Sequence, residues 1–227
     1  MKGRLASLLA VALLAGIAPA AARQPAQARF FPDPSSVFAA DIAFNRLAAE
    51  KGLWAAYRTV AAEDAVLLTP QPQSARIWLK GRKDDPALAM TWQAYRAFVS
   101  CDGRMAATTG TWRRRDGTGG EFVTLWRRDR KGDWKWAFDS RAPGPVLAEA
   151  PEALEGRVAR CKGGRPVGGR EGAPPPRGRQ AAAPLPDDGS LTLDYDVKED
   201  GSRDVRLSVW NGSGYDVVVD SRAGASR

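Results

Sequence analysis

The chain has 227 residues, a formal net charge of +8 and no histidine. The lack of histidine excludes serine or cysteine catalysis that relies on an imidazole, and nearly all zinc sites that use histidine ligands. The positive charge does not predict nucleic-acid binding, because most of the excess lies in one segment, residues 157–179, where Glu171 is the only acid.

Residues 1–22 have the three parts of a secretory signal peptide: a charged start with Lys2 and Arg4, an apolar stretch over Leu5–Ile17, and a small-residue cleavage site that ends at Ala22. The apolar stretch is shorter than the roughly 20 residues of a spanning helix, so no transmembrane segment is expected. We therefore predict a periplasmic or secreted protein of about 205 residues.

Cys101 and Cys161 are the two cysteines of the chain. In an oxidising compartment an even pair favours a disulfide over two free thiols or a metal site. We predict a Cys101–Cys161 bridge and no metal.

Two helices open the part of the chain that follows the signal peptide. Helical spacing of apolar residues predicts the first over Val37–Lys51, capped by Ser35 or Ser36 and ended by Gly52, and the second over residues 53–64. The apolar run Ala65–Thr69 then predicts a strand. Residues 74–81 fit either a short strand or a helix.

Four β-prone segments follow, separated by turn dipeptides such as Asp102-Gly103 and Lys131-Gly132. They predict an antiparallel meander over residues 92–140. Alternation places Phe122, Thr124 and Trp126 on one face of their strand, and Trp134, Trp136 and Phe138 on one face of the next. Two helices packed on a strongly bent antiparallel sheet give an α+β fold over residues 35–142.

The remaining chain is expected to be a linker over residues 143–188 and a three-stranded β extension over residues 189–222. The linker includes one short helix over residues 151–161 and then a basic stretch rich in Gly and Pro. Weak contact of that stretch with an anionic envelope surface is an open alternative to simple solvation. The β extension has one apolar face and needs either the main sheet or a partner to cover it.

The segment from about Phe38 to Asp139 resembles the SnoaL-like, nuclear transport factor 2-like superfamily. The likeness is carried by DIAFNRLAAEKGLWAAYRTVAAEDAVLL, CDGRMAATTGTW and FVTLWRRDRKGDWKWAFD. It implies a ketosteroid-isomerase-like cone fold, in which helices and a curved sheet enclose a pocket. Members include isomerases, cyclases, dehydratases and non-catalytic binding domains, so the resemblance does not assign a reaction.

Ketosteroid-isomerase-like members carry a carboxylate base just after the first strand, which corresponds here to Leu67–Pro70 and contains no acid. Asp64 precedes that stretch and is the candidate base, although an aspartate at a helix-to-strand junction more often caps or turns the chain.

Eight tryptophans give the chain large apolar surfaces, and core packing is their ordinary role. The candidate ligand-binding residues among the aromatic side chains are Trp54, Tyr57, Trp112 and Trp126.

We therefore expect a protein without cofactor that binds a small apolar ligand or a protein partner, with a homodimer as one form of the latter and no nucleic acid. The alternatives are a carboxylate-dependent isomerase or lyase, and an envelope-associated structural protein. The lack of histidine and of an acid at the expected base position favours the non-enzymatic hypothesis.

Overall fold

The computed structural model describes residues 30–83, 90–145, 151–160, 180–181 and 188–224. The predicted signal peptide, Cys161, and residues 162–179 of the basic segment lie outside these residues. Among the described residues, no helix is both long and apolar enough to cross a membrane.

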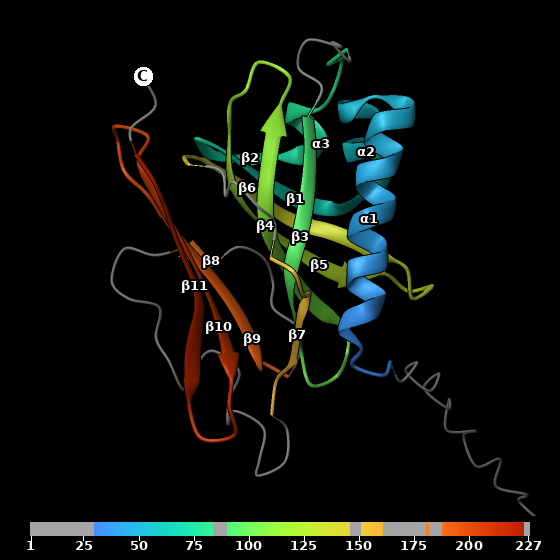
Figure 1. The fold of residues 1–227 in the computed structure, drawn as a ribbon, viewed down its shortest axis with the longest axis vertical. Helices are drawn as coiled ribbons and strands as arrows, with labels where there is room; N and C mark the ends of the chain where they lie inside the picture. The colour runs from blue at the N-terminus through green and yellow to red at the C-terminus, as the bar shows by residue number, and fades with distance from the viewer. Residues whose placement is uncertain (1–29, 84–89, 146–150, 161–179, 182–187, 225–227) are drawn as a thin grey trace, which may run out of the picture.

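The described residues include the helices α1 (Pro34–Lys51), α2 (Leu53–Val60) and α3 (Ala75–Trp78). Figure 1 shows α1 and α2 together on one side of the molecule. The cap of α1 is Asp33, whose side chain accepts a hydrogen bond from the Ser35 backbone N–H at 2.9 Å. The predicted serine cap was therefore wrong, because Pro34 suits the first helical turn, where its missing N–H costs nothing. Gly52 ends α1 with a φ of 96°, as predicted.

The first sheet has seven strands in the order β2-β1-β6-β5-β4-β3-β7. Four neighbouring pairs are antiparallel, whereas β1 runs parallel to β6 and β7 runs parallel to β3. The strands are β1 (Ala61–Thr69), β2 (Gln71–Ser74), β3 (Met90–Val99), β4 (Met105–Arg114), β5 (Gly119–Arg128), β6 (Trp134–Pro143) and β7 (Glu155–Val158).

The second sheet has the order β11-β10-β9-β8, with β8 (Gln180–Ala181), β9 (Leu191–Val197), β10 (Arg203–Trp210) and β11 (Tyr215–Ala223). It packs on the face of the first sheet that is opposite the helices (Figure 1). Leu193, Leu207 and Val209 of this sheet share one apolar cluster with Leu125 and Phe138 of the first. The C-terminal strands therefore form a separate layer and do not extend the main sheet.

The predicted α+β cone is wrong: about 50% of the described structure is strand and 19% is helix, so the fold is mainly β. The helices cover one face of the first sheet, and the second sheet covers the other. Side chains of β4 and β5 are buried on both faces, Ala106 and Trp126 toward the helices and Ala107 and Leu125 toward the second sheet. Packing of two helices on the sheet was expected to bury one of its faces, whereas both faces of β4 and β5 are buried.

The helix predicted over residues 151–161 is also wrong, because residues 155–158 form β7. This strand adds to the edge of β3, with Ala97 opposite Gly156. The backbone N–H and C=O groups at the β3 edge gain partners this way, a requirement that local helix propensity does not express.

Candidate ligand-binding site

A cavity of about 360 Å³ lies between α2, α3 and the first sheet, and we call it the helix-side cavity. Its apolar wall includes the side chains of Leu53, Trp54, Leu67, Trp78, Met90 and Trp112. Its polar lining includes the side chains of Tyr57, Arg82, Arg114, Asp139, Arg141 and Arg203. An aromatic wall with a few polar groups is typical of a small-molecule site.

The aromatic wall is built by contacts between helices. Trp54 of α2 and Trp78 of α3 meet edge to face, with ring centroids 5.1 Å apart, and Trp54 also meets Tyr57 at 5.8 Å. Tyr57 in turn lies 5.3 Å from Trp136 of β6, whose Nε1 donates to the Tyr57 carbonyl at 3.1 Å. These contacts fix α2 against the first sheet and so fix one side of the cavity.

A hydrogen-bonded triad of Tyr57, Asp139 and Arg141 lies in the polar lining. The Tyr57 hydroxyl donates to Asp139 Oδ1 at 3.0 Å and accepts from Arg141 Nε at 2.8 Å. Arg141 Nε also lies 3.2 Å from Asp139 Oδ1, and Thr124 Oγ1 donates to Asp139 Oδ2 at 2.7 Å. Asp139 is therefore a buried carboxylate whose two oxygens are both occupied.

Burial raises the pKa of the Tyr57 hydroxyl well above its usual value; Arg141 opposes this shift and Asp139 adds to it. Burial alone would lower the pKa of Arg141, but Asp139, Tyr57 and Asp41 together raise it. Tyr57 is therefore a neutral donor and Arg141 a fixed cation.

A second polar group lies deeper, around Asp41 of α1, which is 2% exposed. Its Oδ1 accepts from Trp92 Nε1 at 3.0 Å and its Oδ2 from Thr108 Oγ1 at 2.7 Å. Trp126 Nε1 donates to the Thr108 hydroxyl at 2.9 Å and completes the chain of hydrogen bonds. Burial raises the pKa of Asp41 from 3.8 to about 6. Asp41 does not belong to the lining of the cavity.

The four arginines of the lining exceed its single carboxylate. Arg82 lies over the Trp78 ring, 3.5 Å from its centroid, and Arg114 lies 5.4 Å from the Trp112 centroid. Arg203 comes from β10 of the second sheet, and its Nη2 donates to the Arg141 carbonyl at 2.7 Å. Of the four, Arg141 alone forms an ion pair within the described part of the chain.

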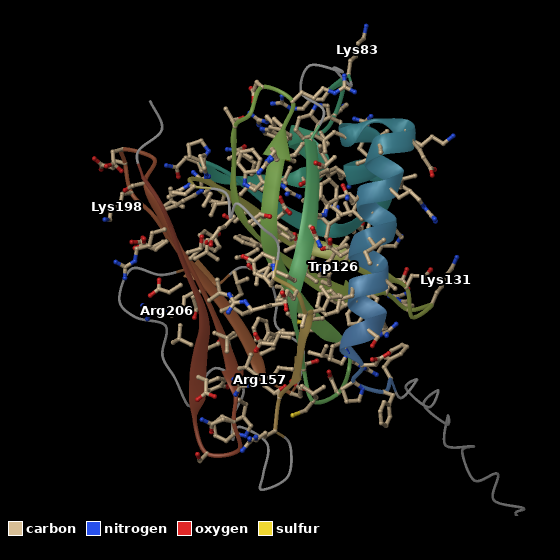
Figure 2. All side chains as sticks on the ribbon, viewed as in Figure 1. Lys83, Trp126, Lys131, Arg157, Lys198 and Arg206 are labelled. Atoms are coloured by element: carbon tan, nitrogen blue, oxygen red, sulfur yellow. The ribbon has the colours of Figure 1, made fainter. Side chains whose placement is uncertain are left out.

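Of the four predicted aromatic site residues, Trp54, Tyr57 and Trp112 line the helix-side cavity. Trp126 does not: its side chain is fully buried between α1 and the first sheet, 5.9 Å from the Phe44 ring (Figure 2). Core packing and the hydrogen bond to Thr108 account for Trp126.

The candidate base Asp64 lies on β1, outside the cavity lining. Arg127 Nη1 donates to its Oδ2 at 3.1 Å, and this hydrogen bond lowers the pKa of Asp64. A carboxylate that is half-exposed, ion-paired and held ionised has the features of a surface salt bridge, and Asp64 does not reach the helix-side cavity.

The predicted disulfide cannot be followed to its second cysteine, which lies outside the described residues. Cys101 follows β3, and its Sγ is 3.7 Å from the carbonyl oxygen of Ala159, two residues before Cys161 in the sequence. The bridge stays a prediction. Within the described ranges, no cluster of three or more His, Cys, Asp or Glu side chains is placed to hold a metal ion.

Sequence reasoning missed Asp139 and Arg141 because alternation was expected to continue through β6. Trp134 and Trp136 do face the helices, but Phe138 packs against the second sheet. The pairing of β5 with β6 shifts between Leu125↔Phe138 and Trp126↔Trp136, so Ala137 is an extra residue, a β-bulge. The bulge reverses the faces of the following residues and directs Asp139 and Arg141 to the cavity. The Asp-Ser-Arg run itself is visible in the sequence.

No family model matches the chain, and no curated protein matches it at a significant level. Among solved structures, the chain is similar to the crystal structure of a conserved protein from Planctomyces limnophilus DSM 3776, at 20% sequence identity and a TM-score of 0.37. The match covers 49% of this chain and 98% of that chain. A likeness of this degree carries no argument, so the resemblance to the SnoaL-like superfamily stays a prediction.

Proposed function

We propose that the protein binds a small molecule with an apolar body in the helix-side cavity, without covalent chemistry on it. The observation that carries the proposal is the cavity of about 360 Å³, whose wall includes three tryptophans from three different elements, α2, α3 and β4. Ligand sites of this size typically bury most of a small ligand against such side chains.

The polar lining supports binding better than it supports catalysis. Asp139 accepts from Tyr57 and Thr124, and Arg141 contacts both of its oxygens through Nε and Nη2, so its acceptor positions are taken up by the protein and not by a substrate. An isomerase or lyase would need an unoccupied carboxylate in the cavity. A periplasmic or secreted location remains part of the proposal, on the basis of residues 1–22.

The test is isothermal titration calorimetry of the purified protein with two bicyclic probes, 2-naphthol and naphthalene-2-carboxylate. Trp78→Ala removes one wall of the cavity, and Trp210→Ala is the matched control. Both tryptophans are partly exposed, and both make one edge-to-face contact, at 5.1 Å to Trp54 and 5.3 Å to Tyr215 respectively.

Trp78→Ala is expected to weaken binding of the better probe about tenfold, because one aromatic contact and its buried area are lost. Trp210→Ala is expected to bind as the wild type does. Failure of both probes to bind the wild type, or equal weakening in both variants, would overturn the proposal.

A further inference from the structure

We infer that the ligand of the helix-side cavity carries an anionic group, a carboxylate or an oxyanion of similar size, held by Arg114, Arg141 and Arg203. This inference rests on the proposed function. It goes beyond it in naming the charge of the ligand and the residues that select it.

The first argument is charge balance. The described lining contains the guanidinium groups of Arg82, Arg114, Arg141 and Arg203 and the single carboxylate of Asp139. Asp139 forms an ion pair with Arg141, and the nearby Asp41 accepts hydrogen bonds from Trp92 and Thr108. An apolar enclosure with this excess of cations attracts an anion, because the Coulomb energy is weakly screened there.

The second argument is unused hydrogen-bonding capacity. Arg141 Nη1, Arg114 Nε and Arg203 Nε are buried and have no partner among the described residues. Arg203 is only 8% exposed, and within the described part of the chain its side chain donates one hydrogen bond, to the backbone carbonyl of Arg141. Burying a cation without an anionic partner is costly, so such groups are normally paired. A bound oxyanion would supply the missing acceptors.

The third argument is the match between guanidinium and oxyanion. Arginine presents N–H donors in a planar fork that fits the two oxygens of a carboxylate, and such charge-assisted hydrogen bonds are the strong ones. Arg114 and Arg141 come from β4 and β6 of the first sheet, and Arg203 comes from β10 of the second. Three independent elements thus bring cations to one cavity, where folding alone would favour apolar side chains.

The test compares three probes of one shape by calorimetry: naphthalene-2-carboxylate, the neutral 2-naphthamide and the cationic 2-naphthylmethylamine. The wild type is expected to bind the carboxylate at least about tenfold more tightly than the amide, and the amine most weakly. This preference should shrink as NaCl rises from about 20 mM to about 500 mM, because salt screens the attraction.

Arg114→Gln is the selective variant, since Arg114 forms no ion pair within 4.0 Å among the described residues and is partly exposed. It is expected to lose most of the preference for carboxylate and to keep the affinity for the amide. Arg115→Gln is the matched control: it removes the same charge from the adjacent position, which is exposed and outside the cavity lining. It should keep the wild-type preference.

Arg114→Met separates ligand recognition from a structural role. If Arg114 serves the ligand, this variant should melt at the wild-type temperature or above it, and should lose the rise in melting temperature that naphthalene-2-carboxylate gives the wild type. A lower melting temperature together with an unchanged carboxylate preference would show a structural role and overturn the inference.

The outcomes distinguish the inference from the function on which it rests. If the amide and the carboxylate bind the wild type equally, the anionic specificity is wrong and small-molecule binding stands. If none of the three probes binds, the proposed function fails with it.

Discussion

The Asp41 carboxylate is buried, and its surroundings determine how the stability of the folded protein should respond to pH. Trp92 and Thr108 donate to it, but the loss of water outweighs these two hydrogen bonds, and its pKa rises to about 6 from 3.8. The folded protein therefore holds a proton at Asp41 at a pH where the unfolded chain has released it. Between the unfolded pKa and the folded pKa of Asp41, the free energy of unfolding falls as pH rises. Above the folded pKa, this loss of stability is constant.

The rise in the pKa of Asp41 corresponds to a loss of about 3 kcal/mol from the free energy of unfolding above the folded pKa. We expect Asp41→Asn to remove this component, so that the variant loses less stability than the wild type between about pH 4 and about pH 7. Urea unfolding at the two pH values measures the difference. Asp64→Asn is the control, because its pKa is lowered by Arg127 and its contribution has the opposite sign. If Asp41→Asn lost as much stability as the wild type between the two pH values, Asp41 would not be the source of the pH dependence.

At the scale of elements, the close approach of β3 and β4 depends on a residue without a side chain. The pairing of these strands shifts between Ala94 and Arg96, and Gly110 of β4 lies opposite Ala94. A Cβ atom on Gly110 would lie 1.9 Å from the Gln93 carbonyl oxygen and 2.8 Å from Ala94 Cα. Both contacts are with backbone, which cannot turn away as a side chain can.

We therefore expect Gly110→Ala to destabilise the protein by about 3 kcal/mol, through displacement of β3 from β4. Gly144→Ala is the matched control, because a Cβ there meets no atom within 4 Å. Chemical unfolding of the two variants measures the effect. Equal stability of Gly110→Ala and the wild type would contradict this prediction, because it would show that β3 and β4 accommodate the added Cβ atom without loss of stability.

The bulge in β6 determines which side chains of this strand reach the cavity and which reach the second sheet. It turns Phe138 toward the second sheet, where its ring stacks on Tyr195 at 5.4 Å, and turns Asp139 toward Tyr57. Bulges re-aim side chains in this way near functional sites. The same irregularity thus serves the contact between the sheets and the polar lining of the cavity.

At the scale of the whole molecule, the two sheets share one core and should unfold together. Leu207 of β10 is fully buried in the cluster that contains Phe98, Leu125 and Phe138 of the first sheet. Seven of the eight tryptophans lie between Trp54 and Trp136, so tryptophan fluorescence reports mainly on the first sheet.

Leu207→Ala is expected to cost about 2–5 kcal/mol and to lower the midpoint of the tryptophan-fluorescence transition, although the substitution is in the other sheet. Val217→Ala, at a position on β11 that is 52% exposed, should change stability by less than about 0.5 kcal/mol. A fluorescence midpoint that does not move in Leu207→Ala would indicate that the sheets unfold independently.

The sequence by itself predicted many, but not all, of the local elements of this protein. Apolar spacing and Gly52 marked α1, turn dipeptides marked the ends of β3 to β6, and alternation marked β9 to β11. These signals depend on neighbours a few residues apart, which is why they can be read without a structure. Aromatic composition also indicated Trp54, Tyr57 and Trp112, all of which line the helix-side cavity.

Only the tertiary structure decided which faces are buried and which charges meet. Whether a strand is covered on one face or two depends on a layer formed mainly by β9, β10 and β11, which begin more than forty positions beyond β6. That Ala137 is an extra residue is visible only in the register of β5 against β6, where it has no partner. Arg203 reaches the cavity only because the second sheet packs against the first. Contacts between residues far apart in the sequence leave no local pattern. The cationic lining, which determines the proposed specificity, is therefore seen only in the folded molecule.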